Sequence, residues 1–184
     1  MTEAALARQV EAELALFSYP LQDWVRPVRD PGHAIVHNVV IVGGGQAGLA
    51  VAFGLRQERI SGVVVLDENP DGREGPWITC ARMITLRTLK FLTGPDLGVP
   101  SLTFRRWHAA HYGEAAWDNL IRIPRQDWMR YLVWFQRRVD GQHRPDFHRP
   151  QRDAVRIAAP DQAYFVRIFV RSGGRAAGRV RNLR

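Results

Sequence analysis

The sequence predicts an α/β fold that is built on two parallel strands joined by a helix. Two apolar runs predict the strands, one near 37–42 and one near 62–67. Between them, three consecutive glycines lead into a helical pattern near 46–58. A strand, a helix and a second strand in this order form a right-handed crossover unit with parallel strands.

The glycine turn between the first strand and the helix has Gly-x-Gly-x-x-Gly spacing. Gly43 lets the backbone turn sharply out of the strand, and Gly48 lets the helix pack tightly on it. Gly45 lacks a Cβ, so we expect that a pyrophosphate can approach the main chain there. The free N–H groups at the helix start, together with the helix dipole, form an anion site. The predicted pyrophosphate-binding residues are Gly43, Gly44, Gly45, Gln46, Ala47 and Gly48.

An acidic residue follows the second strand where a ribose would be bound. Asp67 lies beyond Gly43 at close to the spacing of about 20 residues that is expected of dinucleotide sites. A carboxylate there accepts hydrogen bonds from ribose hydroxyls and repels a 2′-phosphate, which favours FAD or NAD over NADP. The alternative is that the glycines serve only packing and that Asp67 caps a turn. The order of strand, turn, helix, strand and acid favours the dinucleotide interpretation and a Rossmann-like domain.

Composition excludes several classes of protein. The chain has 184 residues, of which 46% are hydrophobic, as in a globular protein with one core. Its net charge of +8 owes much to the arginines from Arg167 onward, so we expect no specific nucleic-acid partner. The longest apolar run, 39–55, is internal and rich in glycine, so neither a membrane span nor a signal peptide is expected. A single cysteine, Cys80, fits a reducing compartment and hence the cytoplasm.

The segments before the first strand predict a helix and a connector. Residues 3–17 have apolar side chains at helical spacing, which predicts an amphipathic helix that caps the domain. Residues 18–32 contain three prolines and read as a connector, with Trp24 as an anchor.

The chain beyond Asp67 carries a resemblance to a known family. Gly75-Pro76-Trp77 resembles the Gly-Gly-x-Trp element that follows the ribose-binding acid in flavin-containing, Baeyer–Villiger and N-hydroxylating monooxygenases. Glu74 stands where the first of these glycines is usual. Segment 85–91 resembles the family's segment beside the flavin, with Arg87 where asparagine is common. Segment 94–100 resembles its aspartate–proline loop, and 124–135 resembles a helix that packs on the sheet. The apolar residues of 124–135 also recur at helical spacing, so this segment is the first clear helix that we expect after Asp67.

This resemblance implies an FAD-binding oxidoreductase. Its cofactor would be FAD, reduced by NAD(P)H, and oxygen activated at the flavin would oxygenate a small-molecule substrate. The stretch from Glu68 to Trp77 would close over adenosine or flavin. The resemblance implies no particular catalytic residue, and neither the substrate nor the oligomeric state can be predicted.

The expected organisation has three parts. Residues 1–35 form the N-terminal helix and connector, 36–170 an incomplete FAD-binding domain, and 171–184 a basic, disordered tail. Strands at 154–158 and 164–170 would begin a β-meander. The change from patterned strand to a Gly/Arg/Ala tail predicts a truncated or frame-shifted chain that is inactive alone. The alternatives are an NAD-dependent dehydrogenase and a non-functional partial domain.

Three other kinds of residue are possible sites, namely histidines, the cysteine and tryptophans. His108 and His111 could share a helical face as metal ligands, but ordinary histidines are expected because no third ligand accompanies them. Cys80 is expected to be a small buried hydrophobe rather than a nucleophile. No metal site is expected. The tryptophans that we expect in the core rather than in a base-stacking surface are Trp107, Trp117, Trp128 and Trp134.

Overall fold

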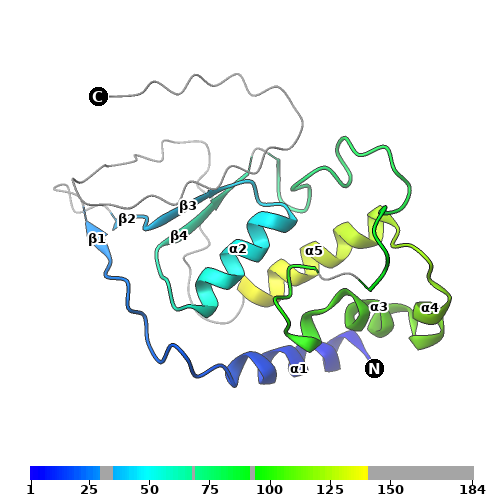
Figure 1. Cartoon of the computed structure of the whole chain (residues 1–184), viewed down its shortest axis with the longest axis horizontal. Helices are drawn as coiled ribbons and strands as arrows, with labels where there is room; N and C mark the ends of the chain where they lie inside the picture. Colours follow the sequence, from blue (N-terminus) through cyan, green and yellow to red (C-terminus); the bar gives the residue numbers. More distant parts are fainter. Residues whose placement is uncertain (30–34, 68, 92–93, 141–184) are drawn as a thin grey trace.

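The computed structural model describes residues 1–29, 35–67, 69–91 and 94–140 (Figure 1). Their helices and strands follow in the order α1 (Glu3–Ala15), β1 (Val28–Arg29), β2 (Ile35–Val36), β3 (Val39–Val42), α2 (Gln46–Gln57), β4 (Val63–Leu66), η1 (Pro100–Leu102), α3 (Phe104–Tyr112), α4 (Glu114–Asn119) and α5 (Arg125–Asp140). The predicted strands at 154–158 and 164–170 and the predicted tail lie outside the described residues.

The predicted strand–helix–strand unit is present. Strands β3 and β4 pair in parallel, from Val39 opposite Val63 to Val42 opposite Leu66. Helix α2 joins them and packs on one face of the pair, where Ala52 lies in a small apolar cluster with strand residues. Strands β1 and β2 form a separate antiparallel pair. The described part of the chain thus has an α/β architecture with a small parallel sheet.

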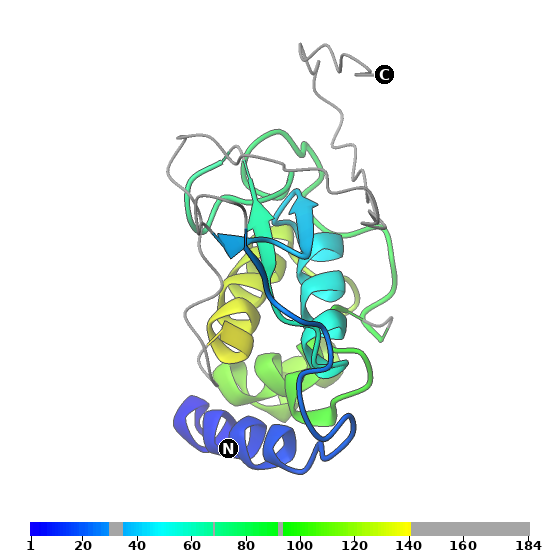
Figure 2. The same ribbon diagram turned by 90° about the vertical axis from the view of Figure 1, so that its left-hand side faces the viewer.

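A layer of helices packs against α2 on the side away from the strands. Figure 2 shows α1 at the base, with α3 above it and with α2 and α5 between these helices and the strand pair. The rings of Phe53 in α2 and Phe135 in α5 meet edge to face, with centroids 5.5 Å apart. Their contact joins the strand–helix–strand unit to the helical layer.

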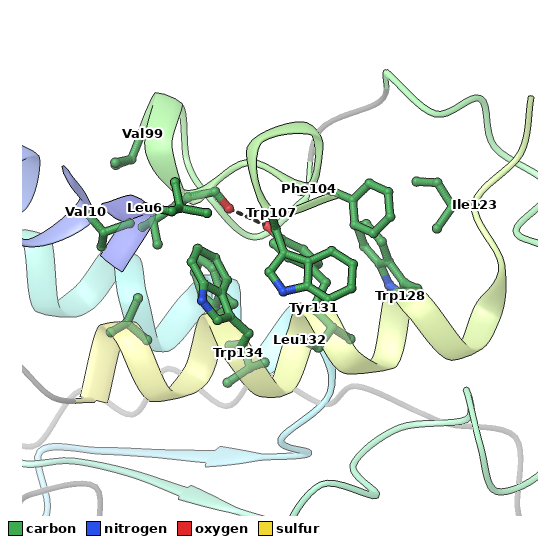
Figure 3. Packing of buried hydrophobic residues seen from close by; sticks show 14 of the residues in the cluster. Leu6, Val10, Val99, Phe104, Trp107, Ile123, Trp128, Tyr131, Leu132 and Trp134 are labelled. Atoms are coloured by element: carbon green, nitrogen blue, oxygen red, sulfur yellow. Dashed lines mark hydrogen bonds between the residues drawn. The ribbon is translucent and has the colours of Figure 1, made fainter. Parts of the chain in front are cut away.

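The core of the helical layer is largely aromatic (Figure 3). All four tryptophans that we expected in the core are buried, which confirms that prediction. Leu6 and Val10 of α1 are fully buried against this cluster, so α1 caps it as predicted. Thr2 caps α1, because its side chain accepts a hydrogen bond from the amide of Ala5.

Two expectations about the fold were wrong. The first clear helix after Asp67 was expected near residue 124, but α3 already begins at Phe104, after the capping residue Thr103. Cys80 was expected to be buried, but it is exposed. Trp24, the predicted anchor of the connector, is 62% exposed and is attached to the end of α2 by its indole N–H, which donates to the carbonyl of Glu58 at 2.8 Å.

Candidate functional site

The glycine turn depends on close contacts between backbone atoms. Gly43 has a φ of +105°, which L-residues with side chains rarely adopt, and its N–H donates to the carbonyl of Leu66 at 2.7 Å. A Cβ at position 48 would lie 1.9 Å from the carbonyl oxygen of Gly43. Only glycine therefore fits at position 48 without movement of the turn.

The start of α2 offers amide donors to a ligand. Its N-cap residue is Gly45, so no side chain caps the helix, and its first turn contains no acidic residue. The amides of the first helical turn have no partner within the helix, and the helix dipole adds partial positive charge there. Gln46 and Ala47 belong to this turn. These backbone groups fit the diphosphate of a dinucleotide.

The structure brings Asp67 directly against the glycine turn. Its Oδ2 accepts a hydrogen bond from the amide of Gly44 at 2.6 Å. Its Oδ1 accepts from the backbone amide of Asn69 at 2.8 Å and from the side-chain amide of the same residue at 3.1 Å. A carboxylate has about four acceptor positions. Oδ2 therefore keeps acceptor capacity for a ribose hydroxyl.

The backbone of Gly75 lies beside Gly45. A Cβ on Gly45 would lie 3.4 Å from the Cα of Gly75, and a Cβ on Gly75, whose φ is +74°, would lie 3.5 Å from the Cα of Gly45. Both distances are ordinary van der Waals contacts, so the segment 74–77 packs directly on the N-cap residue of α2. The approach of a pyrophosphate to Gly45 stays a prediction, and the amides that begin α2 are the donors that it would meet.

Glu74 is a residue of this site that the sequence marked only as a departure from the family pattern. It is 3% exposed, and its Cγ lies 3.2 Å from the place that a Cβ on Gly44 would take. Burial raises the pKa of the Glu74 carboxyl, and the nearby charge of Asp67 raises it further, against the lowering effect of backbone N–H groups in its own turn. Two carboxylates thus lie beside one glycine.

Trp77 is placed near the site but is held by α5. Its ring contacts that of Trp128, with centroids 6.3 Å apart and planes at 74°. Its carbonyl accepts a hydrogen bond from Nη1 of Arg125 at 2.5 Å. Sequence reasoning missed Arg125, whose only signal was its place at the start of a predicted helix. Glu68, the other predicted residue of this stretch, lies outside the described residues.

The segment that resembles the family's flavin-side region packs on the helical layer. Leu86 donates its amide to the carbonyl of Ile123 at 2.8 Å, and the exposed Arg87 accepts on its carbonyl a hydrogen bond from the side chain of Arg122. Lys90 donates from Nζ to the carbonyl of Trp117 at 2.7 Å. Lys90 is therefore directed to the end of α4 in this structure.

His108 and His111 have different partners. His108 is 4% exposed among aromatic rings, and burial lowers the pKa of its imidazole. Nε2 of His111 lies 3.2 Å from a carboxylate oxygen of Glu3 on α1. Within the described ranges, no group of three or more histidine, cysteine or acidic side chains is arranged to hold a metal ion. Searched in the same part of the chain, no helix is both long enough and apolar enough to span a membrane.

Comparisons with known proteins identify the family. Residues 40–180 match the model of a family described as FAD-NAD(P)-binding. The chain is also 52% identical over 137 residues to an FAD-dependent urate hydroxylase of Xanthomonas campestris pv. campestris. That alignment covers 74% of this chain and 28% of the relative, so the chain spans little more than a quarter of the relative's length. No solved structure matches the chain.

These matches agree with the geometry of the site. The family match includes the glycine turn, Asp67 and α5. Two predictions from the sequence are thereby confirmed, namely the flavoprotein family and FAD as its cofactor. The chain belongs to the FAD-NAD(P)-binding family.

Proposed function

We propose that this chain provides the FAD-binding turn of a flavin-dependent hydroxylase. In this proposal the diphosphate of FAD lies on the amides that begin α2, and Asp67 binds the ribose of its adenosine half. The hydrogen bond of 2.6 Å between the Gly44 amide and Oδ2 of Asp67 carries the proposal, because it holds the acid and the turn in one site. Residues 36–170 would then belong to one FAD-binding unit.

The residues present suit this cofactor. The uncapped start of α2 suits an anion, and a carboxylate at position 67 disfavours a 2′-phosphate. Glu74 places a second acidic side chain, itself buried, beside Gly44 and next to Asp67, which further disfavours a 2′-phosphate on a ribose bound there. Bound FAD supplies the redox chemistry of such enzymes. The part of this chain is to bind and orient its adenosine diphosphate half.

The relative suggests the reaction to be tested. Since its name is that of a urate hydroxylase, we propose hydroxylation of a small heterocyclic molecule, with urate as the first substrate to assay. None of the described residues is assigned a catalytic role. We therefore expect the chain alone, which spans 28% of the relative's length, to bind FAD without hydroxylating urate.

The test is a titration of the whole purified chain with FAD and with NAD. We expect flavin absorbance bands at about 370 and 450 nm to remain with the protein after gel filtration. We also expect FAD to bind more tightly than NAD. Asp67→Asn should weaken FAD binding about tenfold or more, because the charged acceptor is lost. Asp118→Asn, at an exposed position on α4, is the control and should bind as the wild type does.

Two results would contradict the proposal. One is a folded wild-type chain, shown by its circular dichroism, that does not bind FAD. The other is an Asp67→Asn variant that binds FAD as tightly as the wild type.

A further inference from the structure

We propose that Arg125 is a positioning residue for the dinucleotide site, although it does not belong to the glycine turn. Its guanidinium, at the start of α5, holds the segment 74–77 against the turn. This inference rests on the proposed function, since it concerns the same site, and it adds a residue from a different element to it.

The first step is the attachment of Trp77 to α5. Nη1 of Arg125 donates to the carbonyl of Trp77 at 2.5 Å, in a partly buried position. Hydrogen bonds from a charged donor are stronger than neutral ones. One helical turn further along, Trp128 packs edge to face on the ring of Trp77. One helix therefore fixes both the backbone and the side chain of Trp77.

Arg125 is itself held in place. Its backbone amide donates to the carbonyl of Ile84 at 3.0 Å, next to the bridge between Thr85 and Pro124. Because the first residue of α5 is fixed in this way, its side chain starts from a defined point. The donor that reaches Trp77 is thus positioned in advance.

The second step is the short and stiff connection from Trp77 to the glycine turn. Only Pro76, whose ring fixes its φ, separates Trp77 from Gly75. The Pro76 carbonyl accepts the amides of Cys80 at 3.2 Å and Ala81 at 2.8 Å. A displacement of Trp77 therefore displaces Gly75 as well.

The third step is the contact with the site. Gly75 lies against Gly45, the N-cap residue of α2, and Glu74 lies against Gly44, which donates to Asp67. Movement of the segment 74–77 would change the surroundings of both glycines. The affinity for the dinucleotide then depends on the hydrogen bond that Arg125 of α5 donates to Trp77.

The experiment compares two arginines of α5 whose side chains both donate hydrogen bonds. Arg125→Met removes the donor to Trp77, whereas Arg130→Met removes the donor to Tyr112 and Asp127, outside the site. The measured quantities are the Kd for FAD, the midpoint of thermal unfolding, and the amide hydrogen exchange of residues 74–81. We expect Arg125→Met to raise the Kd about tenfold and to speed exchange in 74–81. Arg130→Met should change the Kd less than about twofold.

The possible outcomes separate this inference from the proposed function. If the wild type binds FAD and Arg125→Met binds it equally well, or if both methionine variants weaken binding to the same extent, the inference is overturned alone. If the wild type does not bind FAD, the proposed function fails and the inference fails with it. Should Arg125→Met not fold, Arg125→Lys replaces it, because lysine keeps the charge but has a single donor nitrogen. Its Kd should rise about threefold, and an unchanged Kd would overturn the inference.

Discussion

The glycine-turn unit (β3, α2 and β4 with the segment 74–77) and the helical layer packed against it (α1, α3, α4 and α5) depend on opposite kinds of contact. In the glycine-turn unit, the decisive contacts are between backbone atoms, as where Gly48 lies against the carbonyl of Gly43 and Gly75 lies against Gly45. In the helical layer, the decisive contacts are between large rings, such as Trp107 and Tyr131, each no more than 2% exposed. The site is thus shaped by residues that lack side chains, whereas large side chains make the helical layer that supports it rigid.

The difference matters because the two regions respond differently to substitution. A change in the layer removes buried apolar area and leaves a cavity, so it acts on the free energy of unfolding. A change in the turn adds atoms where there is no space for them, so it acts on the shape of the site as well. Predictions that separate stability from FAD affinity therefore test the comparison directly.

The largest expected effect is on stability alone. Trp107→Ala should lower the free energy of unfolding by about 3–5 kcal/mol, because a buried tryptophan leaves a cavity between α1, α3 and α5. Urea denaturation followed by circular dichroism measures this loss. In the absence of urea, the folded fraction should bind FAD within about threefold of the wild type. A loss of affinity as large as that of Asp67→Asn would show that the layer shapes the site as much as it supports it.

The next effect is on both quantities. Gly48→Ala should cost about 2–3 kcal/mol of stability and abolish measurable FAD binding, because its Cβ meets the carbonyl of Gly43 at 1.9 Å. Gly54→Ala, in the same helix, is the matched control. Its Cβ would meet only the end of the exposed Leu97 side chain, at 3.2 Å, and alanine favours helix.

For Gly54→Ala, a change in stability within about 1 kcal/mol and unchanged FAD affinity are therefore expected. Calorimetric melting and FAD titration of both variants provide the comparison. Equal losses in the two variants would mean that crowding at position 48 is not what the site depends on.

The smallest effect is a pH dependence in the helical layer. Burial lowers the pKa of His108, and the charges of His111 and Lys90 act in the same direction, against Asp127. The unfolded chain therefore takes up a proton near pH 6.5, whereas the folded chain does so only at lower pH. Stability should fall as the pH drops below about 6.5.

The test of this dependence is a pair of histidine variants. His108→Leu should flatten the loss of thermal stability between about pH 6.5 and 5, whereas His111→Gln keeps His108 and should retain it. An unchanged slope in His108→Leu would assign the acid sensitivity to other groups.

The sequence predicted those features that local spacing determines. The strand, turn and helix from Val39 to Gln57 follow from glycine spacing and apolar runs, and the position of Asp67 beside Gly44 follows from the length of one crossover. Helices α1 and α5 were predicted because their apolar residues recur at helical spacing. Local pattern was sufficient in each case.

Other features depend on contacts between distant segments, and the sequence could not supply them. Helices α3 and α4 have nine and six residues, and segments this short contain too few turns for a helical period to stand out in the sequence. The contact of Gly75 with Gly45 and the bond from Arg125 to Trp77 join residues 30 and 48 positions apart. Such contacts depend on how the loops are placed by the whole fold, which no local pattern contains.

The exposure of Cys80 has a practical consequence. It is the single cysteine of the chain, and it follows the segment 74–77 closely, with its amide bonded to Pro76. A maleimide fluorophore attached there needs no engineered thiol and no removal of competing thiols. Its emission would give a direct optical signal of the moment at which a ligand enters beside α2.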